Sequence, residues 1–411
     1  MKKSLFAIAA VTAFAGAAQA QSSVTVYGII DAGFSSTSSR NGTNKATNAL
    51  FNSSNASSSR LGFKGNEDIG GGVSVFFTAE LSLSPNDSTQ VLNGNRQTFV
   101  GLGKKGLGKA AIGTQYTLMQ DAVAATDPGG QNNVVGSVIR PAAGFSTASS
   151  VLGSQGAGGD HMVRVTNMLK FNSDKFAGFG LNAAYIQNNV NTNQTATGTN
   201  TLGGTGGTAN FNGWNLSADY AWKKLYVTAA YGSVKQEQNA LGATVSGTGT
   251  TTIPPNNAGN VSKGTTTLAT PDTITAAVNP NTTTNNTYVA GTYDFGILKA
   301  YAGWTNAKIT DNFNSSQYLK RTGQQLGVRG KFTPTIEGWA SAGNGRFTNY
   351  GVGTPTTNFN AWQLGSNYYL SKRTNLYAIY GQTIFSSSSA GGLTPGGAAS
   401  SQYAMGVRHT F

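Results

Sequence analysis

Period-2 alternation is clearest in Trp362-Gln363-Leu364-Gly365-Ser366-Asn367-Tyr368-Tyr369-Leu370. Successive side chains of a β-strand point to opposite faces, so the even-numbered residues share one face and the odd-numbered residues the other. The even face carries most of the large apolar side chains, whereas Gln363, Gly365 and Asn367 make the odd face polar or small. This pattern predicts a strand with one apolar face and one wet face.

Similar segments recur to the last residue of the chain, and helical periodicity is nearly absent. An even number of strands, sixteen, is predicted from them. The predicted strands are 23–36, 58–66, 73–83, 95–102, 108–115, 161–172, 178–187, 213–222, 225–234, 287–294, 297–307, 321–332, 335–344, 358–370, 373–384 and 401–411.

The predicted connections alternate in length: 37–57 is long, 67–72 short, 84–94 long and 103–107 short. Long loops on one side and tight turns on the other indicate an all-β fold, a 16-stranded antiparallel transmembrane β-barrel with periplasmic turns and termini. The barrel must close because lipid cannot satisfy an open sheet edge. A soluble β-sandwich is the alternative, but the polar inner faces supply too little apolar surface for a dry core.

Aromatic residues flank the predicted apolar band at both ends, as expected for the two membrane interfaces. Those toward the loop end are Trp214, Trp304, Trp362 and Tyr403, and those toward the turn end are Tyr220, Trp222, Tyr293 and Phe411.

The composition argues against catalysis. The 411 residues include no Cys, 2 His and only 10% charged residues, which excludes thiolate metal sites and leaves little for a general base. Residues 101–106 satisfy G-x-G-x-x-G, but the dinucleotide fingerprint requires a helix to follow, and a strand is predicted there. The chain is therefore predicted to be no enzyme and to hold no cofactor and no metal.

The N-terminus has Lys2 and Lys3, an apolar run and then Ala18-Gln19-Ala20, the pattern of a cleaved signal peptide spanning 1–20. The rest, 21–411, is predicted to be a single barrel domain. Its basic residues are scattered singly and the protein is exported, so no nucleic-acid partner is expected. The Gly-, Ser- and Thr-rich stretch 235–286 is predicted to be a long surface loop.

Four segments in a fixed order carry a family resemblance. They are Val24–Gly33 (VTVYGIIDAG), Ser59–Gly72 (SRLGFKGNEDIGGG), Arg96–Leu102 (RQTFVGL) and the terminal Phe411. Together they resemble the Gram-negative general porins, most of all their anion-selective branch. The resemblance is strong in the first hundred residues and at the C-terminus, and holds only by pattern in 188–286.

The resemblance implies a homotrimer of water-filled outer-membrane channels, each narrowed by the third outer loop folding into its barrel. That loop is 116–160 here and carries Asp121 and Asp127. The second outer loop, 84–94, would latch onto a neighbouring subunit, and Phe411 would be the assembly signal for membrane insertion. The expected partners are outer-membrane lipid, lipopolysaccharide, and small anionic and neutral solutes.

Alternation assigns residues to the lumen. Arg60 and Lys64 face water if Leu61 and Phe63 face lipid, and by the same argument Arg96 and Thr98 face water and Phe99 and Gly101 face lipid. On 161–172, lipid-facing Val163, Val165, Leu169 and Phe171 leave Arg164, Thr166 and Lys170 in the lumen.

In the anion-selective porins that the chain resembles, positions matching Arg60, Arg96 and Arg164 form a basic ladder opposite the third loop. The function predicted is passive diffusion of small hydrophilic solutes with anion preference. The alternative is a substrate-specific channel or a surface adhesin that uses the long outer loops.

Overall fold

A computed structural model describes residues 23–42, 44–87, 91–139, 163–192, 207–240, 244–251, 266–275, 281–312, 315–316, 318–350, 356–386 and 398–411. The predicted signal peptide and residues 140–160 of the predicted third loop lie outside the described residues.

The elements in chain order are β1 (Ser23–Asn41), β2 (Asn44–Ser53), β3 (Arg60–Gly70), β4 (Val73–Leu83), β5 (Leu92–Lys104), β6 (Gly108–Tyr116), α2 (Leu118–Thr126), β7 (Arg164–Ser173), β8 (Phe179–Thr192), β9 (Gly207–Trp222), β10 (Leu225–Ala240), β11 (Thr244–Thr251), β12 (Thr266–Thr275), β13 (Asn281–Asp294), β14 (Leu298–Asp311), β15 (Tyr318–Lys331), β16 (Ile336–Tyr350), β17 (Thr356–Tyr369), β18 (Thr374–Phe385) and β19 (Ala398–Thr410).

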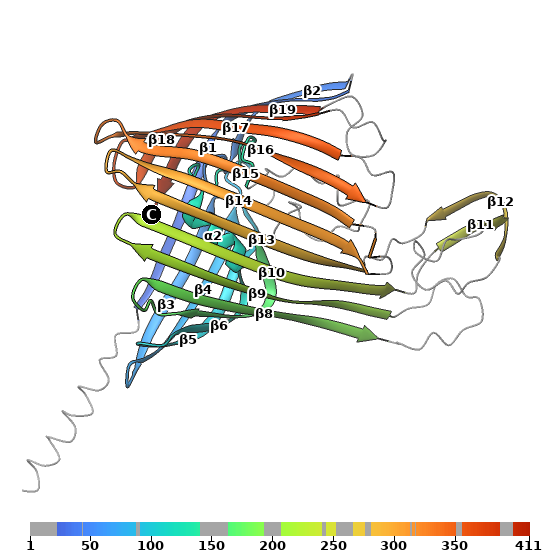
Figure 1. Cartoon of the computed structure of the whole chain (residues 1–411), viewed down its shortest axis with the longest axis horizontal. Coiled ribbons are helices and arrows are strands. Elements are labelled where there is room, and N and C mark those ends of the chain that lie inside the picture. Colours follow the sequence, from blue (N-terminus) through green and yellow to red (C-terminus); the bar gives the residue numbers. More distant parts are fainter. Residues whose placement is uncertain are drawn as a thin grey trace, which may run out of the picture.

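Sixteen antiparallel strands form a closed barrel, which confirms the predicted fold class. Closure takes place at β1, which pairs with β3 over Ser23–Ile29 and with β19 over Ile29–Asn41. Phe411 completes the seam, since its backbone N–H donates to the Gly28 carbonyl and its carbonyl accepts from the Gly28 N–H, both at 3.2 Å. The tight turns lie on the left of Figure 1 and the longer connections on the right.

The outer surface of the barrel is apolar. Exposed side chains include Leu169, Leu216, Leu326 and Leu364, each more than half exposed. The aromatic residues expected at its two ends face outward too, with Trp304 41% and Trp222 55% exposed. This surface matches the lipid-facing band that the alternation predicted.

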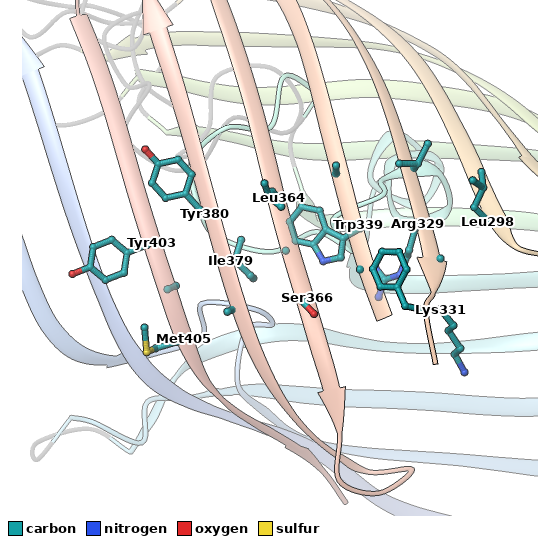
Figure 2. Close-up of a pocket in the computed structure, with 18 of the residues that line it drawn as sticks. Leu298, Arg329, Lys331, Trp339, Leu364, Ser366, Ile379, Tyr380, Tyr403 and Met405 are labelled. Carbon is teal, nitrogen blue, oxygen red and sulfur yellow. The ribbon is translucent and has the colours of Figure 1, made fainter. Parts of the chain in front are cut away.

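A groove of about 800 Å³ lies over β14–β19 (Figure 2). The exposed side chains around it are apolar or aromatic, among them Leu364, Tyr380, Tyr403 and Met405. These side chains belong to the outward-facing set of their strands, so the groove belongs to the outer surface and not to the interior.

The strands continue farther toward the loop end than predicted. β9 ends at Trp222 and β10 begins at Leu225, both as expected, but β10 runs to Ala240 and β16 to Tyr350 rather than to 234 and 344. Beyond the aromatic belt both faces of a strand are polar. The ladder of backbone hydrogen bonds therefore continues where the hydrophobic alternation has stopped.

The first connection differs from the prediction. Residues 37–57 were expected to form a long loop, but β1 continues to Asn41 and returns as β2, with Arg40 opposite Lys45 in the register. Only 54–59 then lead into β3 as an irregular segment. The alternation does not reveal this hairpin because β2 is exposed along almost its whole length.

Three further features were not predicted. Inside 235–286, β11 and β12 pair with each other in a separate two-stranded sheet, and β13 begins at Asn281. The helix α2 has 9 residues and lies in the third loop. Within the described ranges no helix has both the length and the apolar character needed to span a membrane.

Candidate functional site in the barrel interior

The third loop enters the barrel directly after β6. Thr117 is the N-cap of α2, and its hydroxyl accepts a hydrogen bond from the Gln120 N–H at 3.1 Å. The helix packs on the inner faces of β8, β9, β10, β13 and β14. Met119 and Val123 are buried there beside Tyr288, and the Tyr288 hydroxyl lies 2.7 Å from that of Thr126. The described part of the loop is thus inside the barrel, as predicted.

The segment after α2 is held to the inner wall by long polar side chains. Gln363 of β17 donates to the carbonyls of Val134 and Val135 at 2.6 and 2.8 Å. Gln325 of β15 accepts from the Val138 N–H at 2.8 Å. These bonds satisfy backbone groups of a loop that makes no ladder of its own, so the loop is fixed against the wall.

Two arginines of the same wall reinforce this attachment. Arg329 donates to the Pro128 carbonyl at 2.9 Å and Arg321 to the Val138 carbonyl. Arg321 is buried between the rings of Phe347 and Phe359, with its guanidinium carbon 5.6 and 5.1 Å from their centroids.

A second group of charged side chains projects from β3, β4 and β5. Arg96 Nε lies 2.6 Å from Glu80 Oε1, and Arg60 Nη1 lies 3.7 Å from Glu80 Oε2. The Tyr27 hydroxyl donates to the same carboxylate at 3.2 Å. Arg96 also donates to the Tyr116 hydroxyl at 2.7 Å, which links the group to the entrance of the third loop.

Arg164 joins this group from β7. Its guanidinium carbon lies 5.7 Å from the centroid of the Tyr116 ring, and it interacts electrostatically with Arg96 and Glu80. The structure therefore brings together Arg60, Arg96 and Arg164, hereafter the arginine cluster. Arg60 and Arg96 pair with the carboxylate of Glu80, and Arg164 lies beside Tyr116, to which Arg96 donates.

The other predicted lumen residues have local partners. Lys170 forms an ion pair with Asp121 of α2 and donates to the Tyr116 carbonyl at 3.0 Å. Asp127 is buried and accepts from the Gln131 N–H at 2.6 Å, so it shapes the loop. Lys64 Nζ lies 5.4 Å from the centroid of the Tyr27 ring.

The surrounding protein removes part of the hydration of the Asp121 carboxylate and raises its pKa above the usual value, although Lys170 opposes this shift.

Bulges on two strands, β5 and β7, reverse the predicted orientation of several residues. The β4–β5 register shifts between the pairs Glu80–Gln97 and Leu81–Asn95, so Arg96 is an extra residue that points inward. Beyond Arg96, toward the turn end of β5, the inward and outward residues are therefore the reverse of those predicted. Val100 and Leu102 are exposed on the outside, whereas the Phe99 ring lies inside, with its centroid 6.3 Å from that of the inward Phe76. Phe99 and Gly101 therefore face the interior, and Thr98, paired with Thr114 on the outer face, does not.

A second bulge acts on β7. The β6–β7 register shifts between Gly113–Met168 and Gln115–Val165, and Asn167 there has a φ of 55°. Val165 consequently packs inside against Leu118 of α2 instead of facing lipid. Thr166, predicted to face the lumen, follows the inward Val165 in the chain and is exposed.

Arg408 is an interior cation that was left out of the predicted site. It pairs in register with the buried Asp31, its Nε donates to the Ser57 hydroxyl at 2.9 Å, and it interacts electrostatically with Arg60. The alternation with Val407 already places Arg408 on the wet face of the last strand, so the sequence contained the signal.

The comparisons with known proteins agree with this architecture. The family model described as Gram-negative porin matches residues 7–388. Outer membrane porin protein 32 of Delftia acidovorans is 33% identical over 193 residues, which cover 45% of this chain and 49% of that protein. The chain spans about half the length of the curated relatives it matches.

Solved structures cover more of the chain at lower identity. An anion-selective porin from Comamonas acidovorans aligns with a TM-score of 0.65 and 20% identity over 95% of this chain and 100% of that one. The trimer form of OmpT, an outer membrane protein of Vibrio cholerae, aligns with a TM-score of 0.60 and 14% identity over 95% and 99%. At these identities the likeness establishes the fold.

Proposed function

Because the chain belongs to the Gram-negative porin family, we propose that it forms a water-filled outer-membrane channel for passive diffusion of small hydrophilic solutes, with a preference for anions. The observation that carries the preference is the arginine cluster, in which two guanidinium groups pair with the carboxylate of Glu80 and a third, that of Arg164, lies close enough to interact electrostatically with it. A sixteen-stranded barrel is wide enough to hold water rather than a packed core.

The balance of charge along this path favours anions. The Lys170–Asp121 and Arg329–Glu337 pairs cancel within themselves, and Asp127 is engaged by the loop backbone. The arginine cluster keeps two cations in excess over Glu80, whereas Arg408 nearby lies opposite the carboxylate of Asp31. Low-dielectric walls concentrate the field of such charges, so counter-ions accumulate in the channel. No step of this transport requires a reaction or a cofactor.

The proposal includes a homotrimer in the Gram-negative outer membrane, exported through the cleaved signal 1–20. The trimer form of the Vibrio cholerae protein, which has the same fold, supports the oligomer. We expect the native protein to migrate as a detergent-resistant trimer that falls to a monomer only on boiling, because closed barrels unfold slowly. A monomer in mild detergent, with no slower band, would contradict this.

The decisive experiment is a single-channel recording in a KCl gradient. Anion preference predicts a reversal potential on the chloride side, and a diffusion channel predicts conductance that rises with salt without saturating at low concentration. A reversal potential on the potassium side would overturn the anion preference. Saturating block by one solute at low concentration would favour a substrate-specific channel instead.

A further inference from the structure

Three aromatic rings lie on the inner face of the barrel, on the turn side of the arginine cluster. They are the half-buried rings of Tyr27 on β1, Phe76 on β4 and Phe99 on β5, hereafter the aromatic wall. Tyr27 and Phe76 each have a glycine as register partner, Gly62 and Gly101. A Cβ at Gly62 would lie 2.3 Å from the Tyr27 ring, and one at Gly101 would lie 2.5 Å from the Phe76 ring. Each ring therefore lies across the neighbouring strand, against the wall of the lumen.

Two lysines border the aromatic wall. Lys64 Nζ lies 5.4 Å from the centroid of the Tyr27 ring, and Lys109 Nζ lies 5.7 Å from that of Phe76. None of the ion pairs found among the described residues includes Lys64 or Lys109. Their register partners are uncharged: Thr25 and Thr78 for Lys64, and Gly103 and Asn172 for Lys109. A cation–π contact orients an ammonium group without neutralising it, so both charges remain available to an anion.

Three other lysines lie over inward-facing tyrosine rings, at 5.3 to 5.9 Å, but each has a carboxylate beside it. One forms an ion pair with its carboxylate, and the other two lie directly opposite theirs in the register. These pairs are Lys175 with Asp219, Lys299 with Asp294 and Lys331 with Glu337. A carboxylate at each of these places repels a second anion, which the lysines of the aromatic wall do not face.

The aromatic wall is continuous with the arginine cluster. The Tyr27 hydroxyl donates to Glu80 at 3.2 Å, while the ring of the same tyrosine lies against Lys64. Lys64 is four residues from Arg60 on β3, about 13 Å along the strand at roughly 3.3 Å per residue. A strand tilt of about 45° makes this roughly 9 Å along the barrel axis. A solute that passes the cluster toward the turn end therefore meets the aromatic wall next.

We propose that the aromatic wall, together with Lys64 and Lys109, binds aromatic carboxylates of the benzoate type as they pass through the channel. The flat ring of such a solute covers the Phe76 ring, which removes apolar surface of both from water and adds a ring–ring contact. Its carboxylate accepts a hydrogen bond from a lysine at the border of the wall. The inference rests on the proposed anion channel and deepens it by naming the class of anion that the channel favours.

The test is block of the chloride current through single channels of the purified protein at pH 8. Benzoate is compared with cyclohexanecarboxylate, which has the same charge and nearly the same size but no flat π-face. Benzoate should block at about millimolar concentration, because a permeating solute must bind weakly, and about threefold to tenfold more strongly than cyclohexanecarboxylate. The saturated ring is the more apolar of the two, so equal or stronger block by cyclohexanecarboxylate would overturn the proposal.

Four variants locate the site, with trimer mobility on gels as the folding control. F76L keeps an apolar side chain without a ring and should reduce benzoate block to the level of cyclohexanecarboxylate, whereas F76Y should keep the difference. K64Q/K109Q should weaken block by both solutes about tenfold, the contribution of a hydrogen bond to a charged group. K299Q/Y301L removes a lysine and a ring from the opposite side of the barrel and should behave like the parent.

The outcomes separate this site from the channel function. A folded F76L variant that still prefers benzoate, or a K299Q/Y301L variant that loses this preference, would overturn the assignment to the aromatic wall. The reversal potential of the parent in a KCl gradient measures the anion preference without any aromatic solute. Chloride preference without a benzoate preference would therefore refute the aromatic site alone, whereas potassium preference would refute the proposed function.

Discussion

Replacing Arg60, Arg96 and Arg164 together with Ala should reverse the ion preference of the channel. The substitution removes three cations and leaves the Glu80 carboxylate, which in the parent protein has Arg96 Nε at 2.6 Å. The local charge therefore changes from two net positive charges to one net negative charge. If Glu80 were absent, the substitution would only abolish the anion preference. Because Glu80 remains, the channel should instead prefer cations.

The size of the effect follows from Coulomb's law. Two net charges about 6 Å from a permeating ion in water contribute ~1.4 kcal/mol, and screening in about 0.1 M salt reduces this roughly by half. Chloride is then about threefold to fourfold more concentrated beside the cluster than in bulk solution, and potassium is less concentrated by the same factor. The product of the two factors gives a chloride-to-potassium permeability ratio of about 10. One net negative charge gives a ratio of about 3 for potassium in the variant.

The assay is the reversal potential in a KCl gradient at pH 8, with trimer mobility on gels as the folding control. A companion variant that also carries E80Q has no charge left in the cluster and should be nearly unselective. Both preferences should fade as salt approaches about 1 M, where the screening length is roughly 3 Å. A triple variant that keeps the parent's chloride preference would refute the assignment of selectivity to the arginine cluster.

Three further results are expected. Acidification should increase the anion preference of the parent. Because the pKa of Asp121 is raised, its carboxyl takes up a proton at a higher pH than a free Asp does, which leaves the charge of Lys170 uncompensated. The D121N variant should show this higher anion preference at all pH values, and a preference that still changes with pH in D121N would contradict the reasoning. G381A should lower the single-channel conductance without loss of the trimer, because a Cβ at this position overlaps the Val135 carbonyl oxygen and pushes the third loop into the lumen; an unchanged conductance would mean that the loop does not narrow the path. Deletion of Phe411 should leave protein in the periplasm, measured by fractionation, since the resemblance makes this residue the assembly signal and its backbone bonds close the seam at Gly28; normal surface levels would contradict both roles.

The turn ends of the strands were predictable because two constraints meet there. β4 is Val73–Leu83 as predicted, since lipid on one side and water on the other impose alternation up to a short glycine-rich turn. At the loop end water reaches both faces, so nothing in the residue pattern marks where β10 or β16 stops. Backbone pairing alone continues them, and β2 was missed for the same reason.

The interior residues were predictable only where the strands are regular. Arg60 and Lys64 follow from simple alternation on β3. Arg96 has the predicted direction although Phe99 and Val165 do not, because bulges on β5 and β7 shift the register. A bulge adds one residue without changing composition, so parity counted from a distant residue fails across it.

The amino-acid pattern is sufficient for the closed barrel, because every strand must satisfy the same local requirement for alternating faces and lipid forbids an open edge. It is not sufficient for the partners inside the barrel. Glu80 meets Arg60 and Arg96, and Gln363 meets Val134, through residues that are distant in sequence and become neighbours only when the sheet closes and the third loop packs against it. Which cations remain unneutralised depends on those contacts, because an ion pair forms only between groups that the fold brings within a few ångströms.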